Sequence, residues 1–195
     1  MSNQPTAPLI LASASPRRRE LLKEMGLDFQ VVPSAAAELH EGDLTAREVA
    51  MVNAFRKAKE VAVRHPEALV IGADTLVCLD TTLFGKPSNL EEAVEMLKSL
   101  QGLTHHVVTG MCLLSLGQQK RRVFSEMTEV TFRSLTEDQI RHYLSRINPL
   151  DKAGAYAIQD HGELIVDRIE GSYSNVVGLP VEQLGRELLN WRSGS

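Results

Sequence analysis

One continuous apolar run constrains the fold of this chain more than any other feature of its sequence. The run extends from Ala68 to Leu79 (ALVIGADTLVCL) and contains a single charged residue, Asp74. An uninterrupted apolar stretch bounded by turn residues is typical of a central strand in a sheet. Helical periods alternate with further apolar segments on both sides of it. The sequence therefore predicts an α/β or α+β protein in which this run is a central strand.

The helix starts are predicted from capping residues. In three places a Ser or Thr precedes Glu or Gln by three positions, the spacing of a capping box, and in a fourth a Ser precedes Pro at the first helical position. The four starts are Ser15 with Pro16, Thr45 with Glu48, Ser88 with Glu91, and Thr136 with Gln139. The helix after Thr45 is predicted to face the core with Val49, Val52, Phe55 and Ala62.

The other strands are predicted from short apolar or alternating segments. They are 9–12, 27–31, a hairpin of 106–116 and 122–132 around Gly117, and a strand near 164–169. Residues 170–180 are predicted to form a loop, followed by a final helix. His105 and His106 point to opposite faces of the first hairpin strand, so we interpret both as structural or solvent-facing residues.

Composition limits the functional classes that this chain can belong to. With 195 residues and 43% apolar residues, it can bury a core, and we expect a single domain at 9–192 after a flexible N-terminus at 1–8. No apolar run reaches the roughly 20 residues of a membrane-spanning helix, so we expect a cytoplasmic protein without membrane contact. The 21 basic and 25 acidic residues give a net charge of −4, which argues against a nucleic-acid surface.

Three consecutive arginines lie where they are electrostatically unfavourable. Arg17, Arg18 and Arg19 fall in the first turn of a predicted helix, where the macrodipole makes each cation cost about 0.3–1 kcal/mol. A bound phosphate or carboxylate would reverse this, because the unpaired N–H groups of the helix start, the hydroxyls of Ser13 and Ser15 and the guanidinium groups would all face it. The alternative is a solvated basic turn that pairs with neighbouring Glu residues.

Asp74 is the second candidate, because an isolated charge in a central strand is costly unless it is paired or bound to a metal. Ligands of open α/β sheets bind at strand ends, so Asp74 could be a metal ligand or a general base, or it could be satisfied by backbone N–H groups. Glu38, in the loop before the second predicted helix, is a candidate second carboxylate. Lys57, Lys86 and Lys152 are candidate phosphate ligands, with a surface position as the alternative for each.

Five short motifs follow one another along the chain: SASPRR at 13–18, GADT at 72–75, GKP at 85–87, DKAGAYAIQ at 151–159 and GSYSNVVGLP at 171–180. Together, over about residues 9–191, they resemble the Maf family of nucleoside triphosphate pyrophosphatases. The resemblance implies a Maf-like (ITPase-like) α/β fold, with a two-lobed mixed sheet flanked by helices and a deep central cleft. It also implies a homodimer that uses Mg²⁺ or Mn²⁺ to hydrolyse a nucleoside triphosphate to the monophosphate and pyrophosphate.

The resemblance assigns roles to particular positions. Asp74 matches the catalytic aspartate of the family. The family usually has two acidic residues before the second helix; Ala37 stands at the first of these positions here, which leaves Glu38 as the second metal ligand beside Asp74. The expected substrate-binding residues are Ser13, Ser15, Arg17, Arg18, Lys57, Thr75, Lys86, Lys152 and Gln159.

Three positions separate the branches of the family by base. Arg17, Thr75 and Gln159 are the residues of the branch that acts on dTTP and UTP, whereas the 7-methyl-GTP branch has an aromatic residue, Gln and Glu there. The paired donor and acceptor of Gln159 suit the imide edge of uracil or thymine. We therefore expect an enzyme that hydrolyses dTTP and UTP, or modified pyrimidine triphosphates, in a house-cleaning role.

An alternative function is that of a nucleotide-binding regulator of septum formation, with which Maf-like proteins are associated. The arginine turn serves either function. A poised carboxylate beside a metal is needed only for hydrolysis.

Overall fold

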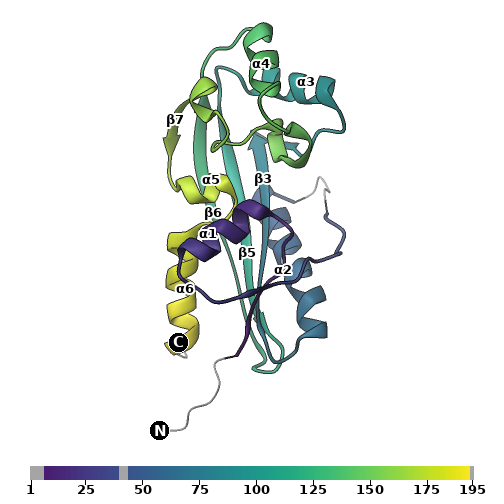
Figure 1. The fold of residues 1–195 in the computed structure, drawn as a ribbon, viewed down its shortest axis with the longest axis vertical. Coiled ribbons are helices and arrows are strands. Elements are labelled where there is room, and N and C mark those ends of the chain that lie inside the picture. The colour runs from purple at the N-terminus through teal and green to yellow at the C-terminus, as the bar shows by residue number, and fades with distance from the viewer. Residues whose placement is uncertain (1–6, 40–43, 194–195) are drawn as a thin grey trace. The chain divides into compact units, whose positions relative to one another are not determined.

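The structure, a computed structural model, describes residues 7–39 and 44–193. Six α-helices and seven strands are found within these residues (Figure 1). Residues 1–6, most of the predicted flexible N-terminus, lie outside the described residues. None of the described helices is long and apolar enough to cross a membrane.

The chain divides into two compact units. Unit 1 consists of the described residues of Met1–Asp74, Gly110–Ser125 and Val181–Ser195, and unit 2 of Thr75–Thr109 and Glu126–Pro180.

The seven strands form one mixed sheet. They are β1 (Leu9–Leu11), β2 (Gln30–Val31), β3 (Leu69–Leu79), β4 (Thr82–Phe84), β5 (Thr104–Ser115), β6 (Lys120–Phe132) and β7 (Val166–Glu170). Their order among the described residues is β2-β1-β3-β5-β6-β7, with β4 paired to β3. β1 is parallel to β2 and β3, whereas the β3–β4 and β6–β7 pairs are antiparallel. The predicted central strand and mixed sheet are confirmed; the predicted cleft stays a prediction.

Unit 1 holds the helices α1 (Pro16–Glu24), α2 (Ala46–Arg64) and α6 (Val181–Ser193). Its core consists mainly of small and branched side chains from β1, β3, β5 and α2, including Ile10, Ala54, Ala58, Val61, Val70 and Cys112. α2 runs close alongside β3 and β5 (Figure 1). A Cβ atom at Gly72 would overlap the carbonyl oxygen of Ala54, and one at Gly110 would overlap the backbone of Ala50. These two glycines therefore permit a close backbone approach between the helix and the strands.

That close approach changes the inner face that the sequence predicts for α2. Val49 and Ala62 are buried as predicted, but Val52 and Phe55 are only half-buried. Phe55 packs against the edge of the unit 1 core, as predicted, and its ring also lies near two cations, with Lys59 Nζ at 5.8 Å and the guanidinium carbon of Arg121 at 5.1 Å from its centroid. Small residues fit opposite the strand glycines, so Ala50, Asn53, Ala54, Ala58 and Val61 turn inward as well.

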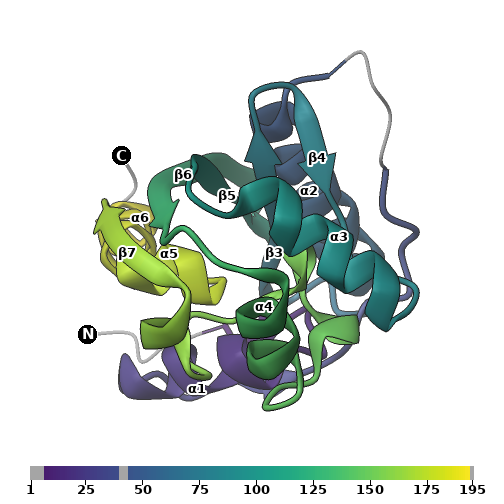
Figure 2. The same ribbon diagram turned by 90° about the horizontal axis from the view of Figure 1, so that it is seen from above.

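Unit 2 holds α3 (Leu90–Leu100), α4 (Glu137–Leu144) and α5 (Tyr173–Val177), with 3₁₀ turns at Pro149–Asp151, Ala153–Ala155 and Gly162–Leu164. Helices α3 and α4 pack side by side (Figure 2). The core below them contains Leu97, Val107, Phe132, Tyr143 and Ile165.

Two local predictions in unit 2 are wrong. The N-cap of α3 is Asn89, whose side chain accepts a hydrogen bond from Glu92 N at 2.9 Å, and not Ser88. Two overlapping cap registers exist in this sequence, and Ser88 N donates to Glu92 Oε2 at 2.7 Å in the register that forms. The predicted loop at 170–180 contains α5, which is too short to show a helical period.

His105 is buried in unit 2, and His106 is partly exposed, as predicted for opposite faces of a strand. His105 Nε2 lies 2.9 Å from Tyr156 Oη, and its ring packs edge-on against Phe132. Burial, and to a lesser degree the neighbouring His106, lowers the pKa of His105 from 6.5 to about 4. His105 is therefore neutral in the folded protein at neutral pH.

The buried imidazole predicts a loss of stability on acidification. The unfolded chain takes up a proton on His105 near pH 6.5, whereas the folded chain does so only near pH 4. The free energy of unfolding should therefore fall as the pH drops from 6.5 to 4, by up to about 3 kcal/mol from this residue. Urea unfolding at several pH values should show a shallower pH dependence for His105→Gln and an unchanged one for His106→Gln. Equal slopes for the wild type and His105→Gln would contradict the assignment.

Candidate active site

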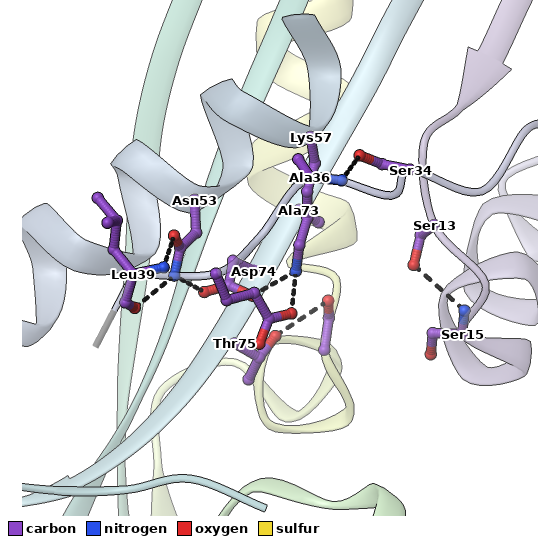
Figure 3. Close-up of polar contacts among 12 residues, drawn as sticks. Ser13, Ser15, Ser34, Ala36, Leu39, Asn53, Lys57, Ala73, Asp74 and Thr75 are labelled. Carbon is purple, nitrogen blue, oxygen red and sulfur yellow. Dashed lines mark hydrogen bonds and ion pairs between the residues drawn. The ribbon is translucent and has the colours of Figure 1, made fainter. Parts of the chain in front are cut away.

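Asp74 lies in β3 with only 4% of its surface exposed. Side chains two apart on a strand share a face, so Asp74 points to the same side as Gly72, the side against which α2 packs. Its Oδ1 accepts a hydrogen bond from Lys57 Nζ at 2.6 Å, and its Oδ2 accepts one from Asn53 Nδ2 at 2.9 Å (Figure 3). Two side chains of one helix therefore hold both oxygens of this buried carboxylate.

Glu38 and Asp74 form ion pairs with the same ammonium group, that of Lys57. Lys57 Nζ lies 2.6 Å from Glu38 Oε1 and 2.6 Å from Asp74 Oδ1. The Glu38 side chain is about one-third exposed, whereas that of Asp74 is almost completely buried. The structure thus brings together the two carboxylates that the sequence singles out, with a lysine between them.

The N-terminus of α1 begins as the sequence predicts. Ser15 is the N-cap and accepts a hydrogen bond from Arg18 N at 3.4 Å, and Ser15 N donates to Ser13 Oγ at 3.2 Å. The first turn of α1 contains no acidic residue. Positive charge therefore gathers at the positive end of the helix dipole.

Arg18 turns toward β3. Its Nη1 donates to Ser13 Oγ at 3.3 Å and to the carbonyl oxygen of Ala73, the residue before Asp74, at 3.0 Å. Burial lowers the pKa of Arg18, while the charges of Asp74 and Glu38 act in the opposite direction. An arginine remains protonated at neutral pH, so a cation is fixed beside the strand that carries Asp74. Arg17 is half-buried and Arg19 is exposed.

The other predicted binding residues belong to unit 2. Thr75 Oγ1 lies 3.0 Å from Thr109 Oγ1. Lys152 is buried, and its Nζ donates to the carbonyl oxygen of Asn148 at 2.7 Å and to Asp151 Oδ1 at 2.8 Å. Lys86 and Gln159 are exposed.

The predicted site residues therefore form two groups. Unit 1 holds Ser13, Ser15, Arg17, Arg18, Glu38, Lys57 and Asp74. Unit 2 holds Thr75, Lys86, Lys152 and Gln159.

Asn53 is the contact of Asp74 that the sequence analysis missed. The apolar period of α2 predicts Val52 and Phe55 on the inner face. It does not predict that the polar residue between them, Asn53, is buried. The signal that could have found it is the spacing from Lys57, because residues four apart on a helix lie on one face. A helix face that carries an amide and a lysine can reach both oxygens of one carboxylate.

The chain belongs to the Maf family, since the family model described as "Maf-like protein" matches residues 8–191. The resemblance carried by the five motifs is thereby confirmed. Among its relatives, a protein of Akkermansia muciniphila is 48% identical over 178 residues, which cover 91% of this chain and 93% of that protein. A protein of Bacillus cytotoxicus is 46% identical over 186 residues, or 95% of this chain and 96% of the relative. Both relatives are named dTTP/UTP pyrophosphatase.

Proposed function

We propose that this chain is a nucleoside triphosphate pyrophosphatase that hydrolyses dTTP and UTP to the monophosphate and pyrophosphate. The observation that carries the proposal is the buried Asp74 carboxylate, oriented by Asn53 and Lys57 beside Arg18. It occurs in a chain whose relatives, similar over more than nine-tenths of its length, are named for this activity.

The proposed reaction is attack of water on the α-phosphorus with pyrophosphate as the leaving group. Such a displacement requires an oriented nucleophile and positive charge where negative charge accumulates. Arg18 and Lys57 are cations already fixed in unit 1, and the Ser13 and Ser15 hydroxyls lie at the N-terminus of α1. These groups, with Arg17, are the proposed ligands of the triphosphate.

Asp74 is the proposed catalytic carboxylate. Both of its oxygens are held by hydrogen bonds, so its orientation is fixed before substrate binds. A fixed acceptor beside a cation can take a proton from an attacking water molecule, and it could also serve as a ligand of a divalent cation.

The donor set also fits a divalent cation such as Mg²⁺ or Mn²⁺. Magnesium is commonly bound by one or two carboxylates together with substrate phosphates and water. Asp74 and Glu38 supply two carboxylates that already converge on one positive charge. No cluster of three or more acidic, His or Cys side chains that could hold a metal is found in residues 7–39 and 44–193, so phosphate oxygens and water would complete the coordination. Such an ion supplies charge neutralisation and lowers the pKa of a bound water.

Thr75 and Gln159 are the proposed residues for recognition of the base. Lys86 and Lys152 are proposed to make further contacts with the phosphates. Lys86 is exposed and can reach a ligand without losing a buried contact. Lys152 would have to exchange a contact with Asn148 or Asp151 for a phosphate oxygen.

A nucleotide panel tests the proposal and the role of Gln159 together. Wild-type protein with Mg²⁺ should release pyrophosphate from dTTP and UTP faster than from CTP or 7-methyl-GTP. Gln159→Glu should lower the preference for UTP over CTP by about 10- to 100-fold, because a carboxylate cannot donate to the uracil carbonyl and can accept from the cytosine amino group. Gln118→Glu, in the exposed hairpin turn, is the matched control and should leave the preference unchanged. Unchanged relative rates in Gln159→Glu would remove this residue from base recognition.

A further inference from the structure

We propose that Asn53 is a positioning residue that orients Asp74 and ties it to the segment carrying Glu38. The inference rests on the proposed hydrolytic function, in which Asp74 is the catalytic carboxylate. Asn53 is 1% exposed and lies on α2, one helical turn before Lys57. A buried amide in the middle of a helix is costly unless its polar atoms are satisfied.

Every polar atom of the Asn53 side chain has a partner. Nδ2 donates to Asp74 Oδ2 at 2.9 Å and to the carbonyl oxygen of Leu39 at 3.1 Å. Oδ1 accepts a hydrogen bond from Leu39 N at 2.7 Å. The amide thus uses both of its N–H donors and its oxygen, and one of those donors is committed to the catalytic carboxylate.

The two contacts with Leu39 fix which way the amide points. In the reversed orientation, the NH₂ group would face the N–H of Leu39, and the amide oxygen would face the carboxylate of Asp74. Both arrangements place like partial charges together. The backbone of Leu39 therefore ensures that an N–H, and not an oxygen, is directed at Asp74 (Figure 3).

These hydrogen bonds and the ion pairs of Lys57 connect the Asp74 and Glu38 carboxylates in a closed network. Asn53 joins Asp74 to Leu39, Leu39 is the neighbour of Glu38 in the chain, and Lys57 joins Glu38 back to Asp74. Without Asn53, Asp74 would lose the hydrogen bond to its Oδ2, and the carboxylate could rotate more freely about its Cβ–Cγ bond. The hydrogen bonds described for the Asn53 side chain run to Asp74 and Leu39, neither of which is a proposed phosphate ligand, so its removal should alter turnover more than binding.

Steady-state kinetics with dTTP and Mg²⁺ test the proposal. Asn53→Leu keeps the approximate volume but has no donor, and Asn53→Asp keeps the shape but places an acceptor against Asp74. Both should lower kcat by about 10- to 100-fold, the usual effect of removing a group that orients a ligating or catalytic carboxylate. The KM for dTTP should stay within about threefold, because the binding groups are unchanged. A residue that only stabilises the fold would not separate kcat from KM in this way.

Glu60→Ala is the matched control. Glu60 lies on the same helix, and its Oε2 accepts a hydrogen bond from Ala35 N of the segment before Glu38. The variant removes one hydrogen bond between α2 and that segment but keeps the contacts of Asn53 with Leu39 and of Lys57 with Glu38, so it should keep the wild-type kcat.

A measurement that needs no turnover separates this proposal from the proposed function. The side-chain NH₂ resonances of Asn53, identified in NMR spectra by their loss in Asn53→Asp, should shift in Asp74→Asn, while those of Asn148 should not. If wild-type protein releases no pyrophosphate, the proposed function fails and this shift alone decides the positioning contact. The positioning role is overturned by an unmoved Asn53 resonance, or by wild-type kcat in a folded Asn53→Leu or Asn53→Asp variant.

Discussion

Asp74→Asn should lower kcat for dTTP by about 10²–10⁴-fold while the protein remains folded. Asparagine has the shape of aspartate, and its amide oxygen can still accept a hydrogen bond from Lys57. It lacks the negative charge needed to take a proton from water or to hold a metal ion. The new NH₂ group would face the N–H of Asn53 or the ammonium of Lys57, so the thermal unfolding midpoint should fall by a few degrees, while the main loss should appear in turnover. Pyrophosphate release and circular dichroism on the same preparation measure the two quantities.

Asp138→Asn is the control for that experiment. Asp138 is an exposed residue in the first turn of α4, and the same chemical change there should leave kcat unaltered. A folded Asp74→Asn variant with wild-type turnover would remove Asp74 from the mechanism.

Gly110→Ala should destabilise the protein by about 3 kcal/mol, which for a chain of this length lowers the thermal midpoint by about 6–12 °C. A Cβ at Gly110 would overlap the backbone of Ala50 and Met51 in α2. Backbone atoms cannot turn away as a flexible side chain can, so α2 would have to move off the strand. Because α2 also carries Asn53 and Lys57, kcat should fall as well.

Gly85→Ala provides the comparison for Gly110→Ala. Apart from its two chain neighbours, none of the described residues has an atom within 4 Å of a Cβ built at Gly85, and the φ of Gly85 is not positive. This variant should unfold within about 2 °C of the wild type. If Gly110→Ala were equally stable, the close packing of α2 on the strands would be wrong.

The elements with strong local signals could be predicted from the sequence. The apolar run of β3 and the capping boxes at Thr45 and Thr136 all form as predicted, because each depends on residues a few positions apart. The buried face of α2 could not be predicted in the same way, because the apolar residues of the helix do not define it alone. It depends on the absence of side chains at Gly72 and Gly110, which lie on two strands outside the helix and contact it only through the tertiary fold.

In the candidate site, too, the local features could be predicted from the sequence, and the contacts that depend on tertiary packing could not. Ser13, Ser15 and Arg18 could be assigned from a local pattern, and the structure joins them by hydrogen bonds near one helix start. The partners of Asp74 come from residues 17 and 21 positions away, so they depend on how α2 packs. That packing buries the amide of Asn53, which the apolar period of α2 did not predict, while Val52 is only half-buried.

The position of bond cleavage tests the central claim most directly. Wild-type protein should be incubated with dTTP and Mg²⁺ in ¹⁸O-labelled water, and the products analysed by mass spectrometry. Attack on the α-phosphorus predicts one pyrophosphate for each dTMP, with the label in dTMP and none in pyrophosphate. Release of orthophosphate, label in the pyrophosphate, or no turnover of dTTP would contradict the account.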